Sequence, residues 1–146
     1  MKYVLIFGAL AIVLVAGALL LVERRIRART RRVLAAQPAV EGERVIELRM
    51  RQSTQFADGI PALFGEGEAD VVCTSAVLVA GRLVIPFAGV EDAAIERGAL
   101  RVRWTGGGEK LVTTLEASVH DLERLRREIH LRQPNVIEKL LSMVQK

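Results

Sequence analysis

The fold class of this 146-residue chain is decided by residues 70–115, which read DVVCTSAVLVAGRLVIPFAGVEDAAIERGALRVRWTGGGEKLVTTL. Short runs of apolar and β-branched residues alternate there with turns that contain glycine, which tolerates the positive φ of tight hairpins. Short strands at nearly even spacing are typical of a small antiparallel sandwich or barrel. The pattern predicts strands at Asp70–Thr74, Ala76–Ala80, Leu83–Pro86, Glu91–Ile95, Leu100–Trp104 and Lys110–Leu115.

A further strand is predicted upstream of this stretch. Ile46, Leu48 and Met50 alternate with charged residues, as in a strand with one buried face. Residues 53–67 (STQFADGIPALFGEG) follow, and their glycines and proline favour a long loop. We therefore expect about seven antiparallel strands.

An amphipathic helix is predicted directly after the last strand. Ser118 and Asp121 resemble a capping box at its start. Apolar residues at helical spacing form its buried face, and they are Val119, Leu122, Leu125 and Ile129. The helix should close over one face or end of the sheet.

Residues 132–146 are predicted to form a short terminal amphipathic helix, separated from the preceding helix by Pro134. Its apolar stripe consists of Val136, Ile137, Leu140, Leu141 and Val144. Such a stripe can dock into a partner's groove or support self-association. It can equally fold back onto the domain, and the sequence leaves both interpretations open.

Residues 3–22 (YVLIFGALAIVLVAGALLLV) contain no charged side chain and are long enough to cross a bilayer as a helix. A cleavable signal peptide is the alternative, because Ala16-Gly17-Ala18 resembles a cleavage site. The apolar run continues past that site to Val22, and arginines follow it, which favours a transmembrane helix.

The next ten residues, ERRIRARTRR, carry the arginines Arg24, Arg25, Arg27, Arg29, Arg31 and Arg32. Positive charge beside a membrane segment tends to stay in the cytoplasm. We therefore expect a single-pass protein of the plasma (inner) membrane, with its N-terminus outside and its C-terminal domain in the cytoplasm. These arginines can also attract anionic headgroups.

Charge outside this run excludes a typical nucleic-acid-binding domain. Residues 33–146 hold 14 basic and 16 acidic side chains, so the basic residues do not dominate any folded part of the chain. Arg101 and Arg103 form only a small basic strip on one strand, opposite Trp104, which should pack in the core.

Catalytic patterns are weak throughout the sequence. His120 and His130 lack zinc-site spacing, and we expect both to lie on the surface. Cys73 lies in an apolar strand, where a buried, inert thiol is the usual state. The glycines before Glu109 fit a hairpin better than a phosphate loop. We predict no enzyme, cofactor, metal site or small-molecule substrate.

The order of about seven strands followed by a helix resembles the pleckstrin-homology (PH) superfold. Thr74 and Leu78 match a strand pair common in bacterial PH-like domains, and Ile85-Pro86 followed by Val90 resembles their next step. GALRVRWTGGGEKLVTTL, residues 98–115, is similar to their last hairpin. The resemblance extends from Arg44 to Leu131 and implies a bacterial, membrane-anchored PH-like domain that binds rather than catalyses.

The predicted organisation is a transmembrane helix (3–22), a basic juxtamembrane segment and connector (23–42), a PH-like domain (43–131) and a terminal helix (132–146). The leading functional hypothesis is a non-catalytic, protein-binding scaffold at the cytoplasmic membrane face, with an unknown protein partner or self-association. The alternatives are binding of anionic lipid by the domain, or a small structural subunit of a membrane complex.

Overall fold

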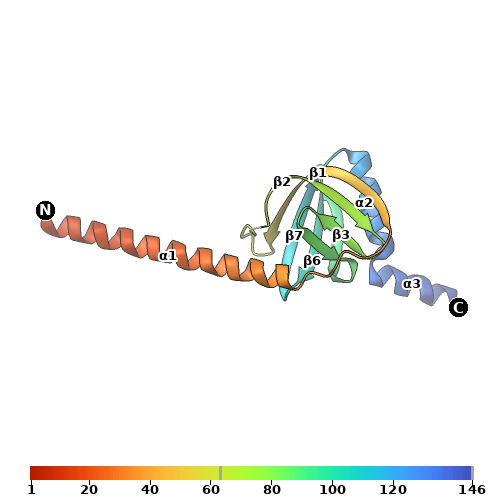
Figure 1. The fold of residues 1–146 in the computed structure, drawn as a ribbon, viewed down its shortest axis with the longest axis horizontal. Coiled ribbons are helices and arrows are strands. Elements are labelled where there is room, and N and C mark those ends of the chain that lie inside the picture. Colours follow the sequence, from red (N-terminus) through yellow and green to blue (C-terminus); the bar gives the residue numbers. More distant parts are fainter. Residues whose placement is uncertain (63, 146) are drawn as a thin grey trace.

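The computed structural model describes residues 1–62 and 64–145, without the side chains of residues 134–137 and 139. Its first element is the helix α1 (Lys2–Ala35), which projects from a small domain of strands (Figure 1). At 1.5 Å per residue its 34 residues span about 50 Å. The apolar part has no buried residues, and the helix is long and apolar enough to cross a membrane.

The described residues of the domain form seven antiparallel strands in one open sheet, which confirms the predicted fold class. The strands are β1 (Arg44–Phe56), β2 (Gly67–Thr74), β3 (Val77–Ala80), β4 (Leu83–Pro86), β5 (Val90–Glu96), β6 (Ala99–Gly106) and β7 (Glu109–Glu116). A short 3₁₀ turn, η1 (Phe87–Gly89), joins β4 to β5. The order across the sheet is β4-β3-β2-β1-β7-β6-β5.

The strand β1 joins the two halves of this sheet. Its first part, through Gln52, pairs with β2, and its second part, from Arg51 to Phe56, pairs with β7. The expected loop at residues 53–67 is therefore wrong for its first four residues, which belong to β1, and for Gly67, which begins β2. Thr54 and Phe56 continue the inward alternation of β1 and are buried, so packing extends the strand past the polar Ser53-Thr54-Gln55 sequence.

The helix α2 (Val119–Arg132) covers the sheet beside β5 and β6. The side-chain oxygen of Ser118 accepts a hydrogen bond from the Asp121 amide, which confirms the predicted N-cap. Leu122, Leu125 and Ile129 are buried in the core, but Val119 is 65% exposed. Its assignment to the buried face is wrong because, at 3.6 residues per turn, Val119 lies about 90° around the helix from the centre of the face formed by Leu122, Leu125 and Ile129.

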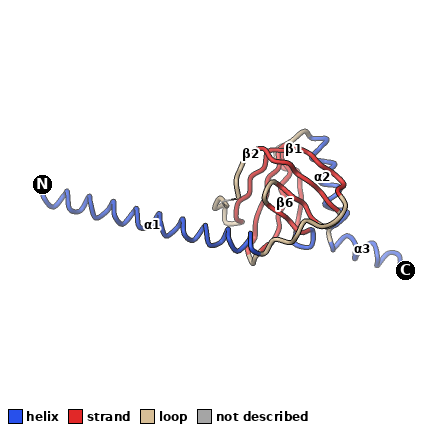
Figure 2. Tube along the Cα trace, in the orientation of Figure 1, coloured by secondary structure: helices blue, strands red, loops and turns tan. Residues whose placement is uncertain are grey.

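The last element is α3 (Pro134–Val144), which contacts α2. Figure 2 shows α1 and α3 leaving the domain on opposite sides. The N-terminal end of α1, which is apolar enough to enter a membrane, is therefore remote from α3.

Candidate functional site: the junction of α1 and the sheet domain

One face of α1 is packed against the domain. Ile26, Arg29, Thr30 and Val33 follow the i, i+3, i+4, i+7 spacing that places residues on one side of a helix. Val33 is 1% exposed and joins the core, and Ile26 packs against it. Thr30 is also buried, and its hydroxyl donates to the Ile26 carbonyl oxygen within the helix. The helix therefore ends as part of the domain.

Arg29 fixes this helix face to two separate turns. Its Nε and Nη2 donate to the two carboxylate oxygens of Glu109, at 3.2 and 2.9 Å, in a bidentate pair at the start of β7. Its Nη1 donates to Oδ2 of Asp58, 2.9 Å away, in the segment after β1. The guanidinium carbon lies 3.9 Å from the centre of the buried Phe56 ring. One side chain thus ties α1 to the end of β1 and the start of β7, which lie side by side at one end of the β1–β7 pair.

The charges of this cluster reinforce one another. The hydrogen bond to Glu109, ahead of the one to Asp58, raises the pKa of Arg29 above its ordinary value. The hydrogen bond from Arg29 lowers the pKa of Asp58. The Arg29 and Glu109 side chains are only 19% and 17% exposed, so water screens this pair weakly, whereas Asp58 is half-exposed.

The turn between β6 and β7 approaches α1 too closely for a side chain. Gly107 has a φ of +59°, and a Cβ there would lie 2.6 Å from the Arg32 carbonyl oxygen and 2.9 Å from the Val33 Cα. The triple glycine is a hairpin turn, as its spacing indicated, because Gly106 pairs with Glu109. Its middle glycine, Gly107, also forms the surface against which the backbone of α1 packs.

The connector after α1 is bound along the domain. The Glu41 carbonyl oxygen accepts from the Thr74 hydroxyl at 2.7 Å, and the Glu43 carbonyl oxygen accepts from the Ser75 amide at 3.0 Å. A Cβ on Gly42 would lie 2.2 Å from the Ser75 hydroxyl oxygen. Hydrogen bonds therefore hold the C-terminal end of the connector on the domain. Its N-terminal end is held because it continues from the packed end of α1.

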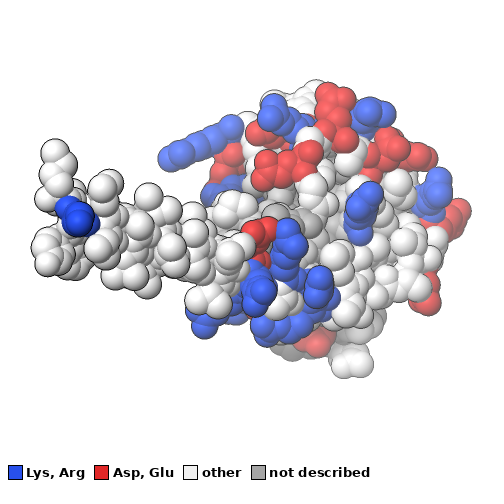
Figure 3. Space-filling model, turned by 60° about the vertical axis from the view of Figure 1, so that its left-hand side comes forward, with Lys and Arg blue, Asp and Glu red and all other residues white. Residues whose placement is uncertain are grey.

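The structure separates the six arginines that the sequence grouped together. Arg29 is part of the junction with the domain, whereas Arg24, Arg25, Arg27, Arg31 and Arg32 are exposed. Figure 3 shows basic side chains gathered where α1 meets the domain. The packed face of α1 was not among the features predicted from the sequence. Its signal was present in Ile26, inside the basic run, and in Val33, the apolar residue seven positions later that directly follows the run.

The proposed docking stripe on α3 is only partly described. Leu140, Leu141 and Val144 are 51%, 57% and 83% exposed, and Met143 beside them is 69% exposed. The side chains of Val136 and Ile137 lie outside the described part of the structure. Among the described side chains of α3, the large apolar ones therefore face solvent.

The residues considered for chemistry are dispersed. Cys73 is fully buried, and desolvation raises the pKa of its thiol to about 11. His120 is exposed, while His130 is half-buried with Nδ1 2.9 Å from Oε1 of Gln133. No group of three or more His, Cys, Asp or Glu side chains converges on a metal position within residues 1–62 and 64–145.

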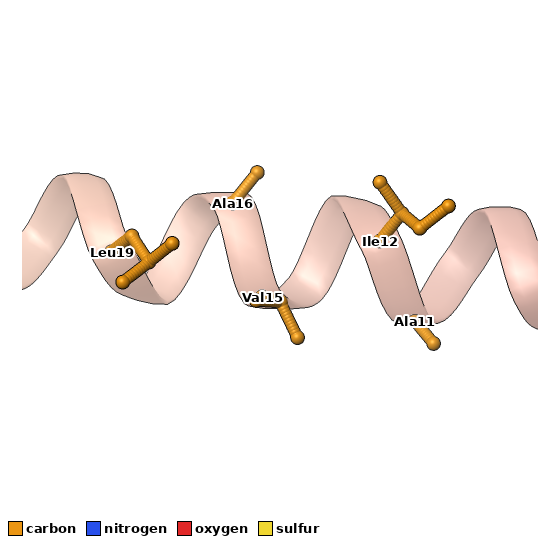
Figure 4. Close-up of a pocket in the computed structure, with 5 residues that line it drawn as sticks. All are labelled: Ala11, Ile12, Val15, Ala16 and Leu19. Atoms are coloured by element: carbon orange, nitrogen blue, oxygen red, sulfur yellow. The ribbon is translucent and has the colours of Figure 1, made fainter.

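Concave surfaces on the described residues are shallow or polar. Figure 4 shows Ala11, Ile12, Val15, Ala16 and Leu19 pointing outward from α1, where a single helix provides no opposing wall. A second hollow of about 430 Å³ lies beside the end of α1, and it is lined by Leu34, Gln52, Phe64, Gly65, Glu66, Gly81 and Arg82. The side-chain amide of Gln52 donates there to the Gly65 carbonyl oxygen.

Replacing Arg29 with glutamine should loosen α1 from the domain. We expect the free energy of docking to fall by about 1–2 kcal/mol, between the values for exposed and fully buried ion pairs, because Glu109 loses its partner. Arg27→Gln is the matched control, since Arg27 pairs with Glu23 in solvent. Hydrogen exchange of the residue 26–35 amides should accelerate only in Arg29→Gln. Equal exchange in both variants would contradict the role of Arg29 in holding α1 on the domain.

The comparisons with known proteins add no assignment: no protein-family model matches the chain, and no curated protein matches its sequence.

Proposed function

We propose that the chain is a single-pass membrane protein whose sheet domain, in the cytoplasm, is a non-catalytic scaffold that binds a protein through α3. The observation that carries the proposal is the position of the exposed apolar face of α3. The helix α3, whose side chains Leu140, Leu141, Met143 and Val144 are exposed, lies on the side of the domain opposite α1 (Figure 1). A helix there cannot reach the bilayer that α1 enters, so a protein is the natural ligand for this face.

The fixed junction supports a scaffolding role. A flexible linker would let the domain move freely below the membrane. Here Arg29, Val33 and Gly107 fix the end of α1, and the connector is hydrogen-bonded to Thr74 and Ser75. A bound partner would therefore be held at a set distance and orientation from the bilayer.

The absence of a catalytic role is also part of the proposal. The thiol of Cys73 is buried and stays protonated near neutral pH because its pKa is raised. The adjacent carboxylates Glu91 and Asp92 also have partners. Glu91 accepts a hydrogen bond from the Thr105 hydroxyl, and Asp92 accepts one from the Arg103 guanidinium. Neither feature offers an activated group beside a binding cavity.

The PH-like and bacterial identities belong to this proposal as well. A sheet in two halves joined by β1, followed by a helix that packs on β5 and β6, supports the resemblance to the PH superfold. The arginines after α1 support a cytoplasmic domain at the plasma membrane.

Direct binding of anionic lipid by the sheet domain is the less favoured function. Arg101 pairs with Glu96, and Arg103 pairs with Asp92 and Glu96, so the predicted basic strip is largely neutralised. The role of a small structural subunit needs only α1 and leaves the exposed α3 without a use.

Cross-linking in native membranes tests the proposal. The tagged full chain and the double variant Leu140→Glu/Leu141→Glu are compared, with Val119→Glu/Leu131→Glu as the matched control. The control residues are apolar and exposed on α2, at 65% and 59%. We expect the α3 variant to lose the captured protein and the control to retain it, since each buried leucine contributes about 1.5–3 kcal/mol.

Two results would contradict this function. Identical proteins captured by the full chain and by a chain ending at Arg32 would assign the contact to α1. A loss of thermal stability in the α3 variant, with its captured protein retained, would show that the stripe packs on the domain.

A further inference from the structure

The arginines that the domain leaves free occupy one side of α1. Arg24, Arg27 and Arg31 follow i, i+3, i+7 spacing, and Arg25 and Arg32 form an adjacent row at i, i+7. The opposite side holds Ile26, Arg29, Thr30 and Val33, which pack on the domain. We call Arg24, Arg25, Arg27, Arg31 and Arg32 the arginine ridge.

The ridge has little charge compensation within the described chain. Arg27 pairs with Glu23, and no described carboxylate lies within salt-bridge distance of the other four guanidinium groups. By contrast, the domain arginines Arg49, Arg101 and Arg103 each have a carboxylate partner. Arg29 is occupied by Asp58 and Glu109, whereas the exposed guanidinium groups of the ridge are available to an external anion.

We propose that the arginine ridge is a one-sided binding site for anionic phospholipid headgroups, formed by α1 and independent of the sheet domain. The inference rests on the proposed membrane anchoring of α1. The ridge begins two residues after Val22, where the apolar stretch ends, so its first arginines lie about 3 Å from the hydrocarbon boundary. Arginine suits this ligand because its planar fork binds phosphate oxygens in bidentate fashion.

The far end of the ridge defines how α1 meets the bilayer. Arg31 and Arg32 lie about 14–15 Å along the helix from Val22, beyond a headgroup layer of roughly 5–7 Å. They reach the phosphates when α1 tilts toward the ridge, as transmembrane helices do by about 20° on average, and when their long side chains extend back. The domain lies on the other side of α1, so it does not obstruct this tilt and is lifted away from the lipid.

An acidic protein is the competing ligand for the same charges. Lipid is favoured because the ridge is continuous with the apolar stretch and follows its helix without a break. A protein site would not need its first two arginines at the edge of the hydrocarbon.

The test uses the full chain in nanodiscs of phosphatidylcholine in which a third of the lipid is phosphatidylglycerol. Native mass spectrometry then counts the lipids that remain bound when the protein is released. The variant is Arg31→Gln/Arg32→Gln, which leaves Arg24, Arg25 and Arg27 to fix topology. The matched control is Arg124→Gln/Arg127→Gln, which removes the same charge from exposed positions on α2.

We expect the wild type and the control to retain phosphatidylglycerol in preference to phosphatidylcholine. The ridge variant should lose about twenty-fivefold in this preference, the product of two roughly fivefold contributions. High salt should weaken the preference of the wild type.

Three outcomes would overturn the inference. An unchanged preference in the ridge variant would do so, and so would a wild type that retains both lipids equally while staying in the bilayer. Release of the wild type from phosphatidylcholine vesicles by an alkaline wash would refute the anchoring itself, and the ridge with it. Wild-type protein that stays in the bilayer but shows no lipid preference would refute the ridge alone. Protein that leaves the bilayer would refute the membrane anchor.

Discussion

Gly107→Ala should detach α1 from the sheet domain. The added Cβ would lie 2.6 Å from the Arg32 carbonyl oxygen and 2.8 Å from its carbon, and these backbone atoms cannot rotate away. Either the β6–β7 turn or the helix must move, which exposes Val33 and separates Arg29 from Glu109. We expect a loss of about 3 kcal/mol in docking free energy, from lost burial and from strain at positive φ.

Gly108 provides a matched control within the same turn. Its φ is +76°, but nothing lies within 4 Å of a Cβ built on it. Gly108→Ala therefore carries a similar backbone strain, about 1 kcal/mol, without the clash. Hydrogen exchange at residues 26–35 and proteolysis of the connector should increase in Gly107→Ala alone. Similar increases in both variants would show that strain, and not the helix contact, is the cause.

Trp104→Ala should destabilise the sheet domain by about 3–5 kcal/mol, the range for removing a buried aromatic side chain. Trp104 is 1% exposed, and its indole nitrogen donates to the Thr113 hydroxyl oxygen at 3.0 Å. That hydroxyl is 2.9 Å from the hydroxyl of Thr54, so one hydrogen-bonded chain joins β6, β7 and β1. Removing the indole leaves a cavity in the core. It also removes the hydrogen bond to Thr113, whose hydroxyl contacts Thr54 on β1, the strand that joins both halves of the sheet.

Cys73 reports this unfolding without an added label. It is fully buried with a pKa near 11, so a thiol reagent should modify it only when the domain opens. We expect faster modification in Trp104→Ala and a smaller change in Trp104→Phe, which keeps most of the ring but not the N–H donor. Equal rates for Trp104→Ala and wild type would contradict the central role of this side chain.

Acid should weaken the α1 junction through Asp58. Its pKa is lowered in the folded chain by the hydrogen bond from Arg29, so its contribution is complete above the ordinary value of 3.8. The contribution is lost as pH falls through the lowered value, because the protonated carboxyl no longer pairs with Arg29. This dependence should disappear in Arg29→Gln.

Local sequence determined the strands and most of their turns. Glycines between apolar runs mark the β3–β4, β5–β6 and β6–β7 hairpins, because only short turns with positive φ reverse the chain there. The spacing of Leu122, Leu125 and Ile129 likewise located the buried face of α2. One error occurred where packing competes with composition, because β1 continues through polar residues to Phe56. The other was at Val119, which lies to one side of the α2 face formed by Leu122, Leu125 and Ile129.

The sequence alone determined the apolar helix, the strands and the terminal helices, because hydrophobic periodicity and turn chemistry are local properties. Only the tertiary structure decided how α1 is attached. Arg29 looks like its neighbours in the sequence, yet it is the one arginine on the face that turns toward the domain, where Asp58 and Glu109 meet it from positions 29 and 80 residues away. Such pairing depends on which turns the sheet brings together, and no local pattern encodes it.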